Sequence, residues 1–166
     1  MRGAGLIVAV ALAGAGSTAA QPAGEWTVKR DPFDPATVRR YHELLATDPY
    51  DRGALATLTN LYTRFRTAAQ LRAVYEGKTD WASLVVLARM TTDADAAREL
   101  WRRAAAVNTN DARAELELAK LTTSNAVEQK AAWNAALARA TLVAHKREAL
   151  RGLASIAVIA RDVPAI

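Results

Sequence analysis

The residues from Lys78 to Asp111, KTDWASLVVLARMTTDADAARELWRRAAAVNTND, contain two helical patterns separated by a short turn. In the first, Asp80 precedes the segment Trp81 to Met90, which is apolar nearly all round and predicts a helix covered on more than one side. In the second, Asp93 precedes the amphipathic segment Ala94 to Val107, whose arginines lie away from the apolar stripe. This stretch therefore predicts two helices joined by a tight turn.

Similar patterns continue on both sides of this pair of segments. The periodicity predicts helices over about 35–48, 53–65, 67–75, 81–90, 94–107, 112–121, 127–142 and 146–160. Turns of only a few residues between such helices require each helix to pack antiparallel to the next. The chain is 51% hydrophobic but only 6% aromatic, with much alanine and little glycine, which favours closely packed helices over sheets. The sequence thus predicts an all-α fold.

An internal repeat is visible in the large apolar residues. An aromatic residue recurs in every second predicted helix, and a leucine recurs in the helices between them. The aromatic series is Tyr41, Tyr75, Trp101 and Trp133, and the leucine series is Leu58, Leu84, Leu118 and Leu153. Most spacings within the two series are close to 34 residues, and each contains one interval of 26 in the same region of the chain, as one shortened repeat predicts.

The repeat resembles the tetratricopeptide repeat family, whose unit is two antiparallel helices of about 34 residues. The residues that match the family's spacing best are Trp81, Leu84 and Ala88 in the first helix and Ala97, Trp101 and Ala104 in the second. Thr109 stands where the family usually has a closing proline, and Glu115 stands one unit after Trp81. The resemblance covers residues 34–166 and implies a right-handed α-solenoid of antiparallel helical hairpins. A different helical-hairpin solenoid is the alternative.

The first 20 residues have the pattern of a cleaved signal peptide. Arg2 provides the positive start, LIVAVALA at 6–13 is the apolar centre, and small residues precede Gln21. The apolar run is far shorter than the roughly 20 residues of a spanning helix, so no transmembrane segment is expected after cleavage. Residues 21–33 contain two prolines and are predicted to be an extended leader. We expect an exported bacterial protein that is periplasmic or secreted.

The last repeat is expected to be incomplete. Residues 162–166, DVPAI, have the pattern of a turn and the start of a second helix that is not present. The apolar residues of the preceding helix, Leu150, Leu153, Ile156 and Ile159, would each lose about 1.5 to 3 kcal/mol if left exposed. We therefore expect the chain to be the amino-terminal part of a longer repeat protein, or to self-associate through its last helix.

No motif in the sequence indicates catalysis. Cysteine is absent, and the two histidines, His42 and His145, lack metal-ligand spacing and are interpreted as solvated surface residues. Glu115 and Glu117 are too close in sequence to share a helical face. There is no glycine-rich phosphate loop, nucleophile elbow or zinc-protease motif, so we predict no enzyme activity, metal or cofactor. The basic pairs lack interleaved aromatics, which argues against nucleic-acid binding.

The resemblance also implies a function. Stacked tetratricopeptide hairpins form a concave groove, lined mainly by the first helix of each pair, that holds extended peptides or partner helices. The polar residues of these helices that the core pattern does not use are Asn60, Arg64, Arg89 and Lys120. We expect a protein-binding module or scaffold in the cell envelope with these residues in its groove. The alternatives are the helical, non-catalytic front part of a larger envelope enzyme and a structural oligomer assembled through the last helix.

Overall fold

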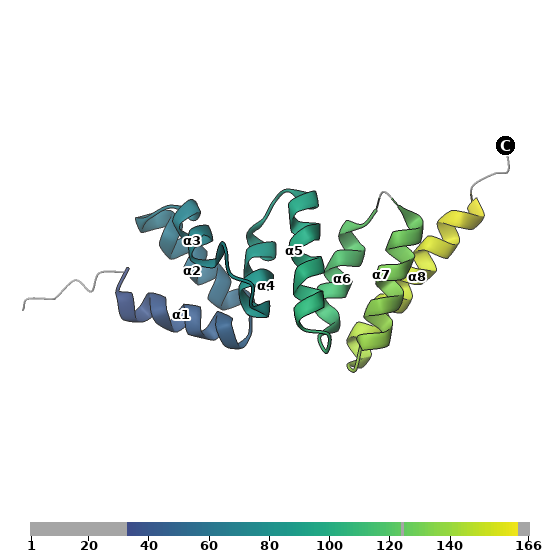
Figure 1. The fold of residues 1–166 in the computed structure, drawn as a ribbon, viewed down its shortest axis with the longest axis horizontal. Coiled ribbons are helices and arrows are strands. Elements are labelled where there is room, and N and C mark those ends of the chain that lie inside the picture. The colour runs from purple at the N-terminus through teal and green to yellow at the C-terminus, as the bar shows by residue number, and fades with distance from the viewer. Residues whose placement is uncertain (1–32, 124, 163–166) are drawn as a thin grey trace, which may run out of the picture. The chain divides into compact units, whose positions relative to one another are not determined.

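The computed structural model describes residues 33–123 and 125–162 of the chain. These residues form eight α-helices and no strand, which confirms the all-α prediction (Figure 1). The helices are α1 (Pro35–Thr47), α2 (Arg52–Phe65), α3 (Ala68–Tyr75), α4 (Trp81–Met90), α5 (Ala94–Val107), α6 (Ala112–Leu121), α7 (Ala126–Arg139) and α8 (Val143–Asp162). The expected signal peptide, residues 1–20, and the expected leader up to residue 32 lie outside the described residues.

Aspartate side chains determine where several helices begin. The carboxylate of Asp34 accepts a hydrogen bond from the Thr37 backbone N–H at 2.9 Å, and α1 follows with Pro35 as its first residue. The Asp80 carboxylate caps α4 and the Asp93 carboxylate caps α5 in the same way. Each accepts a hydrogen bond from a backbone N–H, at 2.9 Å and 2.8 Å respectively. The predicted starts of these three helices are therefore confirmed.

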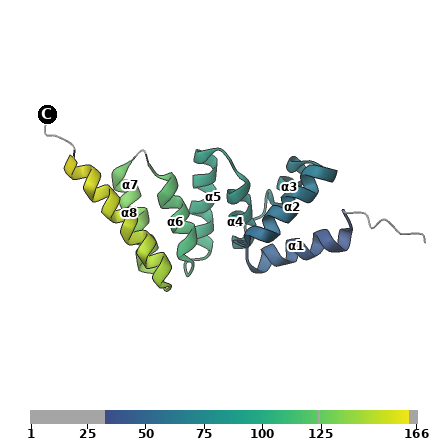
Figure 2. The same ribbon diagram turned by 180° about the vertical axis from the view of Figure 1, so that it is seen from behind.

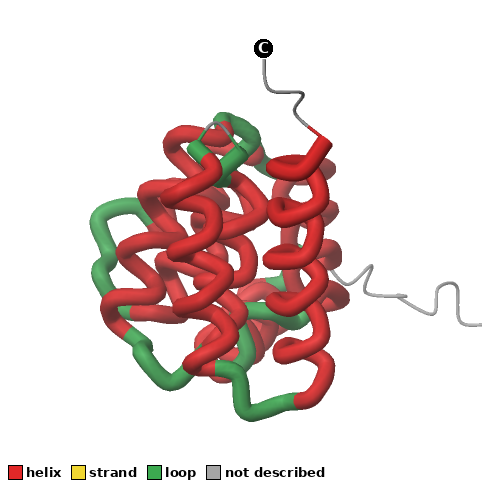
Figure 3. The backbone as a smooth tube through the Cα atoms, turned by 90° about the vertical axis from the view of Figure 1, so that its right-hand side faces the viewer, coloured by secondary structure: helices red, strands yellow, loops and turns green. Residues whose placement is uncertain are grey.

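Each helix contacts the next one along the chain, and α6 also contacts α8 and α1 also contacts α4. The two opposite views in Figures 1 and 2 show α1 to α8 following one another in chain order. Figure 3 shows that the described residues outside these helices are loops joining one helix to the next. The helix α4 contacts α1, α3 and α5, and its residues 83–88 are all buried, which confirms that it is covered on more than one side.

The buried residues form two clusters. The larger one extends from α1 to α6 and includes Leu45, Leu58 and Leu84. The smaller one joins α6, α7 and α8 around Trp133 and Ala149. The half-buried side chain of Leu118 on α6 contacts both clusters. The core therefore continues from one group of helices to the next through α6.

The apolar residues predicted for the last helix divide into two groups. Leu153 and Ile156 are half-buried against the smaller cluster, whereas Leu150 and Ile159 are 54% and 66% exposed. The reason is that α8 packs mainly against α6 and α7, so one side of it is covered. The helix also begins at Val143, three residues before its predicted start at 146, and α7 ends at Arg139 rather than at 142.

Candidate functional site

A pocket of about 630 Å³ lies where the start of α2 meets α4, α5, α6 and α8. Its wall includes five basic residues, two acidic residues and two aromatic residues. The basic residues are Arg52, Arg89, Arg113, Lys120 and His145, the acidic ones are Glu117 and Glu148, and the aromatic ones are Tyr50 and Trp101. The pocket is therefore lined by side chains from parts of the chain that are far apart in sequence.

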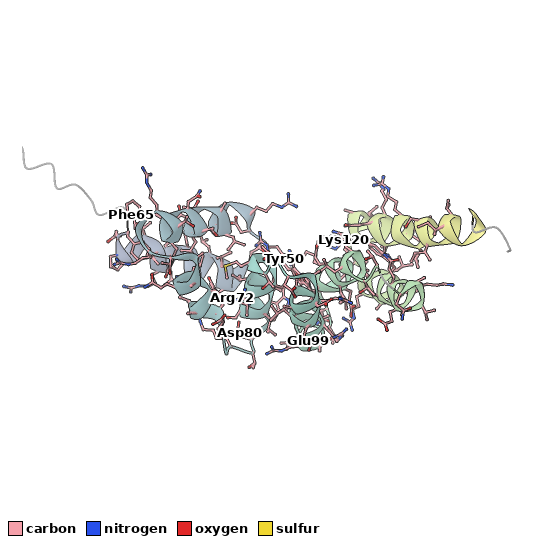
Figure 4. All side chains as sticks on the ribbon, turned by 90° about the horizontal axis from the view of Figure 1, so that it is seen from above. Tyr50, Phe65, Arg72, Asp80, Glu99 and Lys120 are labelled. Atoms are coloured by element: carbon pink, nitrogen blue, oxygen red, sulfur yellow. The ribbon has the colours of Figure 1, made fainter. Side chains whose placement is uncertain are left out.

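The aromatic part of the wall is a stack of side chains. The ring of Tyr50 is nearly parallel to that of Trp101, with 6.2 Å between the ring centres, and it also lies 6.1 Å from Trp81. The guanidinium carbon of Arg113 lies 3.7 Å from the centre of the Tyr50 ring, within the range of a cation–π interaction. Burial, with the nearby Asp111 carboxylate, raises the pKa of the Tyr50 hydroxyl. Figure 4 labels Tyr50.

Arg89, on α4, is one of the predicted groove residues that line this pocket. Its Nη1 donates hydrogen bonds to the backbone carbonyls of Pro49, at 2.5 Å, and Asp51, at 3.3 Å. Burial and the positive charge of Arg52 lower the pKa of the Arg89 guanidinium. The side chain thus joins α4 to the loop between α1 and α2, and part of its role is structural.

Lys120, on α6, is the other predicted groove residue in the pocket wall (Figure 4). Its Nζ lies 2.8 Å from Oε1 of Glu117 and 2.7 Å from Oε1 of Glu148 on α8. Burial disfavours the charged ammonium, but the hydrogen bonds to these two carboxylates outweigh that effect and raise the pKa of Lys120. The positive charge of Lys120 is therefore compensated within the protein, and the residue links α6 to α8.

The remaining two predicted groove residues, Asn60 and Arg64, do not line this pocket. Both are exposed on α2, and the Arg64 guanidinium lies 5.7 Å from the centre of the neighbouring Phe65 ring. Only the first turn of α2 reaches the pocket, through Arg52. The structure therefore brings two of the four predicted residues together and leaves the other two apart from them.

Sequence reasoning missed Arg52, the first residue of α2. Its side chain is exposed and lines the pocket, and no carboxylate of the described residues lies within 4.0 Å of it. By contrast, Arg113 is 3.0 Å from Asp111 and 3.7 Å from Asp48. A signal was available, because a cation in the first turn of a helix opposes the helix dipole, and such local conflicts are typical of functional positions.

The prediction for His42 is wrong, because its side chain is half-buried between helices rather than solvated. Its Nδ1 forms a 2.8 Å hydrogen bond with the hydroxyl of Tyr75 on α3, and its Nε2 lies 3.5 Å from the hydroxyl of Tyr62 on α2. Burial and the positive charge of Lys78 lower the pKa of His42, and burial raises the pKa of Tyr75 to about 12. His42 therefore belongs to a polar contact among α1, α2 and α3.

In the described part of the chain, no group of three or more histidine, cysteine or acidic side chains is placed to hold a metal ion. No helix of the same residues has both the length and the apolar character needed to cross a membrane.

The helices and their contacts define the class of this chain as an all-α protein. No family model, no curated protein and no solved structure matches it. The pocket chemistry is therefore the starting point for a functional proposal.

Proposed function

We propose that this chain is a non-catalytic protein-binding module or scaffold of the cell envelope, periplasmic or secreted, that binds a peptide or a partner helix. In this proposal the helices form a right-handed α-solenoid of tetratricopeptide-like antiparallel hairpins. The contacts of each helix with the next one support it, as does the burial of the repeated aromatic residues Trp101 and Trp133. No cofactor takes part.

The observation that carries the proposal is the position of the pocket. Its wall includes residues of α2, α4, α6 and α8, which are the first helices of the hairpins in the proposed repeat, together with Ala97 and Trp101 of α5. Alternate helices of a solenoid lie on the same side of the stack, so an extended ligand can reach a pocket that they share. A volume of about 630 Å³ is in the usual range of ligand pockets and is large enough for a few residues of a peptide.

The lining suits the two kinds of group that every peptide contains. The exposed Ala94 and the half-buried Leu121 provide apolar surface for side chains. Arg52 provides a guanidinium that can donate to a backbone carbonyl or to a carboxylate. Because Arg89 and Lys120 already bind groups of the protein, Arg52 is the cation most available to a ligand.

The experiment compares Arg52→Ala with Arg64→Ala on peptides selected from a random library with the wild-type chain. Both changes remove one exposed arginine from α2, but only Arg52 lines the pocket. We expect Arg52→Ala to weaken peptide binding about tenfold, as loss of a charged hydrogen bond predicts, and Arg64→Ala to leave it unchanged. Isothermal titration calorimetry gives the affinities, and circular dichroism verifies the fold. Equal affinities for Arg52→Ala and the wild type would refute the proposal.

A further inference from the structure

One side of α8 combines exposed apolar residues with positive charge. Val143, Lys146, Arg147, Leu150, Arg151 and Ala154 line a shallow hollow of about 430 Å³, and we call these six residues the basic face. Val143 is 70% exposed and Leu150 is 54% exposed, while Val158, farther along the helix, is 58% exposed. The opposite side of α8 carries the buried Ala149, which belongs to the core cluster with α6 and α7.

The charges of the basic face have no partner within the described residues. No carboxylate of that part of the chain lies within 4.0 Å of Lys146, Arg147 or Arg151. The acidic residue nearest to them along α8, Glu148, is paired with Lys120 on α6. Elsewhere an exposed arginine such as Arg102 pairs with an acid, Glu99, one turn away. The basic face is therefore a surface of one sign of charge.

This charge argues against a second copy of the same face as its partner. A symmetric contact would bring the three cations of one copy against the same three cations of the other, and like charges at an interface are unfavourable. A membrane surface is also a poor match, because membrane-binding helices usually carry aromatic or large apolar residues, and the basic face has one leucine and no aromatic residue.

The shape of the basic face favours a helix. Val143, Leu150 and Ala154 are spaced by seven and four residues along α8, so they form one stripe on its surface. The small side chain of Ala154 permits a ridge of a second helix to approach closely. Lys146 and Arg151 flank this stripe on its two sides, since they project about 60° to 80° away from it around the helix axis.

We propose that the basic face of α8 binds an acidic amphipathic helix of a partner protein. The apolar stripe of the partner helix contacts Val143, Leu150 and Ala154. Its flanking glutamates or aspartates form ion pairs with Lys146, Arg147 and Arg151. This site is on a different surface from the peptide pocket, and it does not depend on the function proposed for that pocket.

The test uses fluorescently labelled synthetic helical peptides as probes for the wild-type chain. One set carries a leucine stripe flanked by glutamate, and a matched set carries lysine in place of glutamate. We expect saturable anisotropy changes with the glutamate peptides, weaker at high salt, and none with the lysine peptides. Failure of every glutamate peptide to bind would overturn the proposal.

Charge-reversal variants locate the site. Arg147→Glu with Arg151→Glu is expected to weaken glutamate-peptide binding by about tenfold or more. Arg39→Glu with Arg40→Glu makes the same charge change on exposed residues of α1 and is the matched control, expected to bind like the wild type. Equal weakening by both pairs would show a nonspecific charge effect and overturn the proposal. Arg52→Ala should bind normally, which separates this site from the pocket.

Two further measurements test the other occupants. Sedimentation is expected to show that the wild-type chain and the variant with Arg147→Glu and Arg151→Glu have the same oligomeric state. Vesicles of phosphatidylcholine with phosphatidylglycerol are expected not to retain the chain. A dimer that requires the basic face, or vesicle binding in place of peptide binding, would overturn the proposal in favour of self-association or a lipid surface.

Discussion

Oε1 of Glu115 on α6 lies 2.5 Å from Nη1 of Arg139 on α7, and the two side chains form an ion pair between these helices. The same Nη1 donates a hydrogen bond to the carbonyl of Ala105 on α5, at 3.2 Å. Glu115 is buried, at 8% exposure, and it occupies the position that Trp81 holds one repeat earlier. A charged residue is acceptable at this position because Arg139 compensates it and connects three helices.

Replacing Glu115 by alanine is expected to lower the free energy of unfolding by roughly 2 kcal/mol. The change leaves the Arg139 charge near the core without its partner, and the cost is below the 3 to 5 kcal/mol typical of fully buried pairs because Arg139 is only half-buried. Urea denaturation followed by circular dichroism measures it. Glu76→Ala, which breaks the exposed pair with Arg72, is the control, expected to cost less than about 1 kcal/mol.

Gly152→Ala is expected to destabilise the protein by roughly 1 to 3 kcal/mol, although alanine is the better helix former. A Cβ atom at Gly152 would lie 2.3 Å from Cε2 of the Trp133 ring, so α8 would have to move away from α7. Gly53→Ala is the matched control, because its Cβ would meet only the Asp51 Oδ1 at 3.4 Å. Thermal unfolding compares them. A rise in melting temperature for Gly152→Ala would contradict this packing of α8.

The stability of the protein is expected to fall at mildly acidic pH because of His42. Its pKa in the folded protein is below the ordinary value of 6.5, so the unfolded chain binds the proton more readily. The stability that neutral His42 contributes is complete above its ordinary pKa of 6.5 and is lost as the pH falls through its lower pKa in the folded protein. We expect wild type to lose more stability than His42→Gln between about pH 7.5 and pH 5 in urea denaturation. Parallel curves for the two proteins would exclude this linkage.

Arg89→Ala is expected to lower the free energy of unfolding by roughly 1 to 3 kcal/mol. The change removes the hydrogen bonds to the carbonyls of Pro49 and Asp51, which are next to α2 and would lose a charged donor. Arg64→Ala, which removes an exposed arginine of α2, is expected to change stability by no more than about 0.5 kcal/mol. Chemical denaturation of both variants provides the comparison. No difference between them would mean that the Arg89 contacts do not stabilise the fold.

The sequence predicted the helices well because their signals are local. Each of the capping residues Asp34, Asp80 and Asp93 accepts a hydrogen bond from the backbone N–H three residues later in the sequence. The spacing of the apolar residues in α4 and α5 indicates directly which side of each helix is buried. The errors in position are at α7 and α8, where the segment around Ala140 has no such capping carboxylate to mark the boundary. The candidate site was predicted only in part, since Arg89 and Lys120 line the pocket and Asn60 and Arg64 do not.

The sequence alone determined the all-helical fold, most helix boundaries and the residues available to a core, because these depend on backbone capping and on side-chain period within one helix. Only the tertiary structure decided which polar groups meet. The rotation of each packed helix brings Glu115 to Arg139, His42 to Tyr75, and Arg52 into the pocket wall. Such contacts join residues far apart in the chain, and they depend on interhelical packing that no local pattern encodes.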